Sequence, residues 1–254
     1  MNEQAEKKTH FGYREVAASE KASLVRAVFD SVADQYDLMN DLMSLGVHRI
    51  WKREFAATSG VGPGDRVLDL AGGTGDIAAL LSKRAGARGR IVLSDIHESM
   101  LTVGRRRLED SGSVGNVRYA IAYAEKLPFE DAGFDAVTIA FGLRNVTDKD
   151  AALAEMHRVL RPGGRVLILE FSAVQAEPLK ALYDSWSFGM LPRLGRLVAG
   201  DEESYRYLAE SIRRHPPQVE VADMMRKAGF DPVRYRNMTG GIVAIHTGVR
   251  PGHA

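Results

Sequence analysis

The sequence predicts an α/β protein with a mostly parallel sheet, helices on both sheet faces and an antiparallel hairpin at the end. Short apolar segments rich in β-formers alternate with helical segments between residues 66 and 171, as the crossovers of a parallel sheet require. The first apolar segment runs into a glycine-rich turn at residues 72–75. The last two apolar segments are separated only by Thr239-Gly240, so they must pair antiparallel.

Composition bounds the class of protein. The chain has 254 residues, of which 45% are apolar, enough for one substantial α/β domain with an insertion. The net charge of +1 gives no electrostatic case for nucleic acid. The absence of cysteine excludes disulfides, thiol nucleophiles and zinc–thiolate sites and fits a reducing cytoplasm. No signal peptide or membrane span is evident, so we expect a cytoplasmic protein that at most rests on a membrane surface.

The N-terminal region precedes the alternating pattern. Residues 1–20 are polar and predict a flexible arm, while one domain is expected over residues 21–254. In residues 21–58 the apolar side chains recur at helical spacing. We expect helices there, interrupted near Tyr36-Asp37 and Gly46, that fold over the site as a lid.

The alternating region supplies five strands and three helices. The strands are expected at residues 66–71, 90–95, 116–121, 134–141 and 165–171. The intervening helices are expected at residues 75–84, 98–109 and 149–160. Because most residues of these strands are apolar, both faces of this sheet should be covered.

The C-terminal third contains an insertion, at residues 174–215, before the pattern resumes. A helix at 219–228 and strands at 232–238 and 241–249 complete the fold. Apolar and basic side chains alternate in the insertion: Leu179, Lys180, Leu182, Tyr183, Trp186, Phe188, Met190, Leu191, Arg193, Leu194, Arg196 and Leu197. Such a segment suits a channel for an apolar ligand or a face resting on anionic lipid. A helical subdomain with its own core, or a homodimer face, remains an alternative.

The glycine turn predicts a ligand at a helix N-terminus. Residues 67–76 form a strand, a turn containing Gly72 and a helix start, so backbone amides crowd around the ligand. The spacing also fits a weak dinucleotide fingerprint. Asp69, near the strand's carboxyl end, argues against a dinucleotide because it would repel a pyrophosphate and attract an ammonium group. Alternatively, the turn is rich in glycine only because it is tightly packed.

Asp95 closes the second strand, about 20 residues after the glycine turn. An acid at this position can accept hydrogen bonds from ribose hydroxyls. N-capping of the following helix is the alternative role. The two roles are compatible, and the preceding glycine turn favours the ribose.

The chain resembles a known family over nearly its whole length. The segments that carry the resemblance are Phe29–Trp51, Val67–Asp76, Ser94–Leu101, Ala124–Phe129, Phe141–Thr147, Leu160–Phe171 and Ser204–His215. Together they resemble the bacterial ubiquinone/menaquinone biosynthesis C-methyltransferase family. Phe141-Gly142-Leu143-Arg144-Asn145-Val146 is much more specific to this family than the glycine turn is.

The resemblance implies a class I methyltransferase fold with a seven-stranded Rossmann-like sheet, and S-adenosyl-L-methionine as cofactor. It implies cofactor contacts at Thr74, Asp95 and the pair Tyr123-Ala124. Two residues depart from the family pattern. Tyr123 stands where Asn or Asp is usual, and Ala140 stands where Ser is frequent. A tyrosine there can stack on the adenine or offer a hydroxyl, but it has no amide for the adenine amino group.

Arg144 and Asn145 are the candidate catalytic residues. They follow the fourth strand, at the edge where such sheets bind ligands. Methylation of an aromatic carbon requires an aligned ring and a stabilised phenolate. Arg144 is a suitable cationic partner but a poor base, so we expect a water to carry the proton while Asn145 orients the ring oxygens. A surface loop is the alternative. His48 could act as a base, although a packed helical histidine is the commoner outcome.

The resemblance therefore implies C-methylation of the ring of a polyprenylated quinol, with no metal ion. Another small-molecule methyltransferase and a non-catalytic cofactor-binding protein are the competing interpretations. The polar pair Arg144-Asn145 favours an enzyme, because a sensor needs no such pair.

Overall fold

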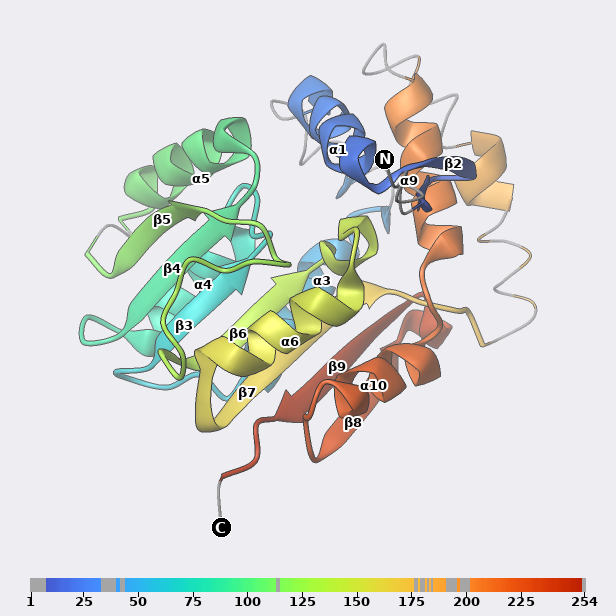
Figure 1. The fold of residues 1–254 in the computed structure, drawn as a ribbon. Helices are drawn as coiled ribbons and strands as arrows, with labels where there is room; N and C mark the ends of the chain where they lie inside the picture. The colour runs from blue at the N-terminus through green and yellow to red at the C-terminus, as the bar shows by residue number, and fades with distance from the viewer. Residues whose placement is uncertain are drawn as a thin grey trace, which may run out of the picture.

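The fold is known from a computed structural model that describes residues 8–32, 40–41, 44–112, 115–175, 178, 181, 183, 185–190, 196 and 202–252. A seven-stranded sheet in the order β5-β4-β3-β6-β7-β9-β8 forms its centre (Figure 1). The strands are β3 (Arg66–Leu70), β4 (Arg90–Asp95), β5 (Val117–Ile121), β6 (Phe134–Ala140), β7 (Leu160–Phe171), β8 (Val233–Met238) and β9 (Val243–Val249). The five strands β3 to β7 are parallel, and β9 pairs antiparallel with both β7 and β8. The predicted sheet and terminal hairpin are confirmed.

Helices cover both faces of the sheet. On one face lie α3 (His48–Thr58), α4 (Asp76–Ala85) and α5 (Glu98–Asp110), and on the other α6 (Lys149–Val159) and α10 (Gln218–Lys227). Figure 1 shows α6 and α10 in front of the sheet and α3 and α4 behind it. Successive strand residues point to opposite faces, so Val67 joins the core under α3 and α4, and Leu68 the core under α6.

The N-terminus differs from the predicted flexible arm. Residues 8–17 form the antiparallel hairpin β1 (Lys8–Phe11) and β2 (Arg14–Ala17), which leads into α1 (Ala18–Val32). The Phe11 ring stacks on Tyr207 at 4.1 Å between centroids, and the Tyr13 N–H donates to Glu210 Oε2 over 3.0 Å. Two short polar strands are marginal alone, so contacts with α9 (Glu202–Arg214) stabilise a hairpin that its composition did not indicate.

The N-terminal helices have two different roles. α1 lies beside α9 above the carboxyl edge of the parallel strands (Figure 1). α3 instead buries Trp51 and Phe55 in the core, so of these two helices of the predicted lid, α1 is the one that lies over this edge. Tyr36 and Asp37 lie outside the described residues.

The predicted insertion is described in part. It contains a π-helix, η3 (Ser185–Met190), and the long helix α9. Most of its apolar and basic residues, including Leu179, Lys180, Leu191 and Arg193, lie outside the described residues. The channel and lipid-face interpretations therefore stay predictions.

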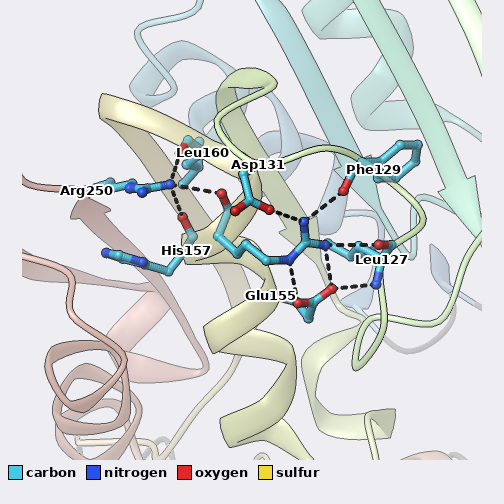
Figure 2. Close-up of polar contacts among 8 residues, drawn as sticks. Leu127, Phe129, Asp131, Glu155, His157, Leu160 and Arg250 are labelled. Carbon is cyan, nitrogen blue, oxygen red and sulfur yellow. Dashed lines mark hydrogen bonds and ion pairs between the residues drawn. The ribbon is translucent and has the colours of Figure 1, made fainter.

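The loop that follows β5 is anchored by Arg158, in the last turn of α6. Its guanidinium donates to Glu155 Oε1 and Oε2, to Asp131 Oδ1 and to the carbonyl oxygens of Leu127 and Phe129, over 2.6–3.0 Å. Figure 2 shows this cluster together with Arg250, which donates to carbonyl oxygens at the C-terminus of α6. The Arg250 contacts satisfy carbonyl groups that the end of α6 leaves unpaired. The Arg158 contacts hold the β5–β6 loop in place.

Candidate active site

Two cavities adjoin at the carboxyl edge of the parallel strands. The outer cavity lies between α1 and the ends of β3, β4 and β6, and its lining includes four predicted site residues: Asp95, Tyr123, Ala124 and Asn145. The inner cavity lies beside α3 and the start of α4, and its lining includes the other predicted cofactor residues: Asp69, Gly72 and Thr74. Ala71 and Phe141 line both cavities. The six predicted cofactor residues are thus brought together.

The backbone between β3 and α4 is shaped for close approach of a ligand. Ala71, Gly73 and Gly75 adopt left-handed conformations with φ of 50°, 55° and 83°. A Cβ on Gly72 would lie 2.3 Å from Leu93 Cδ1 and 2.7 Å from Asp69 Oδ2, so a larger residue there would displace these buried side chains. The strained non-glycine residue Ala71 sits at the junction of the cavities, as expected of a functional turn.

Asp69 is completely buried at the end of β3. Its Oδ1 accepts a hydrogen bond from Thr138 Oγ1 over 2.8 Å, while Oδ2 has no hydrogen-bond partner within the described part of the chain. Burial raises the pKa of Asp69 to about 7. A cation beside Oδ2 would satisfy this oxygen and favour the carboxylate. A ligand with an ammonium group would meet this requirement.

Asp95, at the end of β4, links the glycine turn to the next helix. Its Oδ2 accepts from the Gly73 N–H over 2.9 Å, and its Oδ1 accepts from the His97 N–H over 3.0 Å. His97 Nδ1 also lies 2.7 Å from Oδ1. The N-cap of α5 is His97 rather than Asp95. Oδ2, which accepts one hydrogen bond, retains acceptor capacity, so the same group can receive a ribose hydroxyl.

Tyr123 and Ala124 follow β5. Ala124 is buried, whereas Tyr123 is 47% exposed, and its hydroxyl accepts from Arg26 Nη2 of α1 over 3.5 Å. The departure from the family pattern at this position therefore forms a contact across the mouth of the outer cavity. Ala140 lines the inner cavity instead.

Arg144 lies in a short 3-10 helix, η2 (Leu143–Asn145), directly after β6. Its guanidinium is buried and paired with Glu170, with Nη1 3.1 Å from Oε1, and it also donates to the Phe141 carbonyl oxygen. Glu170 accepts from the Arg144 N–H as well. The cation that was expected to hold the phenolate is thus paired with Glu170, and Arg144 does not line the outer cavity.

Asn145 lines the outer cavity and is fixed by a residue that sequence reasoning missed. Tyr207 of α9 donates from its hydroxyl to Asn145 Oδ1 over 2.9 Å. Burial raises the pKa of Tyr207 above its usual range, so the phenol remains a donor. The motif around Tyr207 is part of the family resemblance, but its spacing carries no sign of a partner 62 positions away.

A third cavity, which we call the cationic cavity, lies behind Tyr207. Basic side chains gather on its lining: His10, Lys21, Arg144, Lys149 and Arg214. Lys21 and Lys149 both donate to the Val146 carbonyl oxygen, over 3.2 and 3.3 Å. Burial and the Lys149 charge lower the pKa of Lys21 to about 8, and burial lowers the pKa of Lys149. This cavity provides positive charge close to Asn145.

His48, the remaining catalytic candidate, lies away from the cavities. His48 is buried, with Nδ1 2.9 Å from Ser44 Oγ, and burial lowers its pKa; it fits the packed histidine interpretation. Asp30 accepts from Ser99 Oγ over 2.5 Å, which joins α1 to α5. Among the residues that the structure describes, no cluster of three His, Asp or Glu side chains is arranged to bind a metal ion. Likewise, none of the described helices is long and apolar enough to cross a bilayer.

The strand order, the left-handed glycine turn after β3 and the acid after β4 define a class I S-adenosylmethionine-dependent methyltransferase. Solved structures with this fold include a methyltransferase of Haloferax volcanii in complex with the Trm112 activator, at a TM-score of 0.68 and 19% identity over 91% of this chain and 99% of that one. Another is the phosphoethanolamine N-methyltransferase 2 of Haemonchus contortus in complex with S-adenosyl-L-methionine, at a TM-score of 0.58 and 17% identity over 79% of this chain and 52% of that one.

The chain belongs to the ubiE/COQ5 methyltransferase family, whose family model matches residues 15–250. It is 64% identical over 252 residues to the ubiquinone/menaquinone biosynthesis C-methyltransferase UbiE of Xylella fastidiosa (strain M23), covering 98% of this chain and 100% of the relative. It is 58% identical over 250 residues to the enzyme of the same name from Pseudoalteromonas translucida (strain TAC 125), with the same coverage. The family, the fold and the cofactor expected from the sequence are confirmed.

Proposed function

We propose that this chain methylates a ring carbon of a polyprenylated quinol in ubiquinone or menaquinone biosynthesis. The acceptors are demethylmenaquinol, 2-polyprenyl-6-methoxy-1,4-benzoquinol or both. The observation that carries the proposal is the polar pair Asn145–Tyr207 at the outer cavity, backed by the positive charges of the cationic cavity. The names of the relatives that match the whole chain support the same substrate class.

When bound, S-adenosyl-L-methionine supplies a methyl group on a positively charged sulfur. The acceptor carbon is a weak nucleophile until the neighbouring hydroxyl loses its proton, because the phenolate pushes electron density onto the ring. Asn145 can hold that oxygen through its amide N–H groups, since its Oδ1 is occupied by Tyr207. The amide is thereby oriented before the acceptor arrives, which is how preorganised donors lower a barrier.

Charge near Asn145 favours the phenolate. Lys21, Arg144 and Lys149 line the cationic cavity, and Arg144 is paired with Glu170. The two lysines add positive charge to this pair, and that charge acts on an anion that develops nearby. We propose that Arg144 acts in this electrostatic role while its pairing with Glu170 holds Asn145 in position. Lys21, with its lowered pKa, can exchange a proton with a water between it and the acceptor hydroxyl.

Phe141 lines the outer cavity and is the ring against which the acceptor would rest, with two further aromatic side chains packed against it. The Phe141 ring lies 5.0 Å from Phe171 and 6.3 Å from Trp51, measured between centroids. Phe141 has a φ of 57°, a strained conformation that turns the chain after β6 into η2. Such a wall excludes water and orients a flat ring. The polyprenyl tail and any contact with the membrane surface would then involve the insertion at residues 174–215.

The experiment is transfer of labelled methyl groups to short-chain forms of both demethylated quinols, side by side. We expect labelled product with at least one quinol. Asn145→Ala and Tyr207→Phe should slow transfer, Asn145→Ala by ~10²–10³-fold as for loss of one preorganised donor. Tyr235→Phe, which changes an exposed tyrosine on β8, is the matched control. Cofactor binding without transfer to either quinol would contradict the proposed acceptor and support the cofactor-binding protein instead.

A further inference from the structure

The inner cavity contains a buried lysine that the predicted cofactor site did not include. Lys52 lies on α3 and is 8% exposed. It lines the inner cavity together with Asp69, Gly72, Thr74 and Asp76. Among the described residues of that lining, Lys52 is the single cationic side chain.

Lys52 and Asp69 give the cavity two charged groups of opposite sign. Asp69 has an oxygen without a hydrogen-bond partner among the described residues, so it can accept from a cation. Lys52 donates from Nζ to Asp76 Oδ2 over 2.6 Å. An α-amino acid group has a matching pair of charges, with its ammonium and its carboxylate on one carbon.

The contact between Lys52 and Asp76 is suited to exchange. The Lys52 side chain is 10% exposed and the Asp76 side chain 37% exposed. A buried ammonium group needs an anion because water cannot replace one. Asp76 is the first residue of α4, where the half-exposed carboxylate can turn to solvent and still be favoured by the helix N-terminus. Asp76 can therefore lose its ion pair with Lys52 and become solvated, whereas Lys52 needs another anion in its place.

We propose that Lys52 binds the carboxylate of the methionine part of S-adenosyl-L-methionine, and that Asp76 is its substitute partner when the cofactor is absent. The ammonium lies at Asp69 and the nucleoside in the outer cavity, which meets the inner one at Ala71 and Phe141. Lys52 is then a specificity residue: it selects cofactors that retain the amino-acid carboxylate. This proposal rests on the cofactor and is independent of the acceptor quinol.

The test compares two ligands that differ only at this group, S-adenosyl-L-methionine and decarboxylated S-adenosylmethionine, by isothermal titration calorimetry without an acceptor. We expect the wild-type protein to prefer the intact cofactor by on the order of 10–100-fold, the strength of a hydrogen bond between charged groups. Lys52→Met should remove most of this preference by weakening the intact cofactor alone. Lys52→Arg should retain most of it.

Two further variants separate a direct contact from a structural effect. Arg53→Met removes one positive charge from the next, exposed position of the same helix and should leave both affinities unchanged. Asp76→Asn removes the substitute partner and should maintain or raise the affinity for the intact cofactor. The proposal is overturned if Lys52→Met weakens both ligands equally, or if the wild-type protein binds them equally. If the wild-type protein shows the expected preference for the intact cofactor but methylates neither quinol, the proposed function is contradicted instead.

Discussion

The buried ion pair Arg144–Glu170 gives the sharpest prediction about stability and catalysis together. The two side chains are 4% and 1% exposed, and Arg144 Nη1 lies 3.1 Å from Glu170 Oε1. Arg144→Met leaves Glu170 as a buried carboxylate without its cation. Removing one partner of such a pair typically costs about 3–5 kcal/mol, against less than about 1 kcal/mol for an exposed pair.

Glu170→Gln in the same protein should recover part of this loss. The amide is neutral, but its single oxygen can keep only one of the two backbone N–H bonds that Glu170 accepts, from Arg144 at Oε2 and from Phe171 at Oε1. We expect a coupling energy of about 1–3 kcal/mol between the two sites. Urea unfolding of the wild-type protein, both single variants and the double variant gives the four free energies of unfolding from which this coupling energy is calculated.

Single-turnover methylation at saturating cofactor then isolates catalysis, because the double variant is stable enough to assay. If the Arg144 charge acts on the acceptor, the double variant should remain slower than wild type by ~10²–10³-fold. If the double variant recovers the wild-type methylation rate together with its stability, Arg144 only shapes the turn. A loss of under about 1 kcal/mol in Arg144→Met would refute the buried-pair reasoning itself.

Four further predictions concern the cofactor site and Lys21. Asp95→Ala should raise the cofactor dissociation constant, at a cost of about 1–3 kcal/mol; an unchanged constant by calorimetry would remove Asp95 from the site. Tyr123→Asn should maintain or tighten cofactor binding, and a large loss would reveal a stacking role for the ring. Cofactor affinity should fall as pH drops from 8 to 6, because Asp69, with a pKa of about 7, loses the charge that pairs with the ammonium; titration calorimetry at both pH values tests this. For Lys21, the folded pKa of about 8 lies below the ordinary lysine value of 10.5. The unfolded state thus binds more protons between these pH values, and stability gains up to roughly 3 kcal/mol across this window. Lys21→Met should lack that gain when unfolding free energies at pH 7.5 and 10 are compared with wild type.

The order of strands and helices was predictable because it depends on local pattern. Apolar runs in β3 to β7, helical periodicity in α4 to α6 and the glycine turn after β3 are each set by residues a few positions apart. The pairing of β8 with β9 followed from the shortness of the Thr239-Gly240 connection. Asp69 and Asp95 were predictable for the same reason, since each ends a strand and parallel strands share a carboxyl edge.

The contacts that complete the site depended on tertiary structure. Asn145 meets Tyr207 62 positions away, Arg144 meets Glu170 26 positions away and Lys21 meets Val146 125 positions away. Nothing in the spacing of these residues indicates their partners. The hairpin at residues 8–17 belongs with them, because it is stabilised by α9. The sequence by itself determined the sheet, its helices and the acids at its edge, since these follow from periodicity and turn chemistry. Only the tertiary structure decided that Arg144 pairs with Glu170 and that Tyr207 bonds the amide of Asn145. These contacts depend on how distant elements pack.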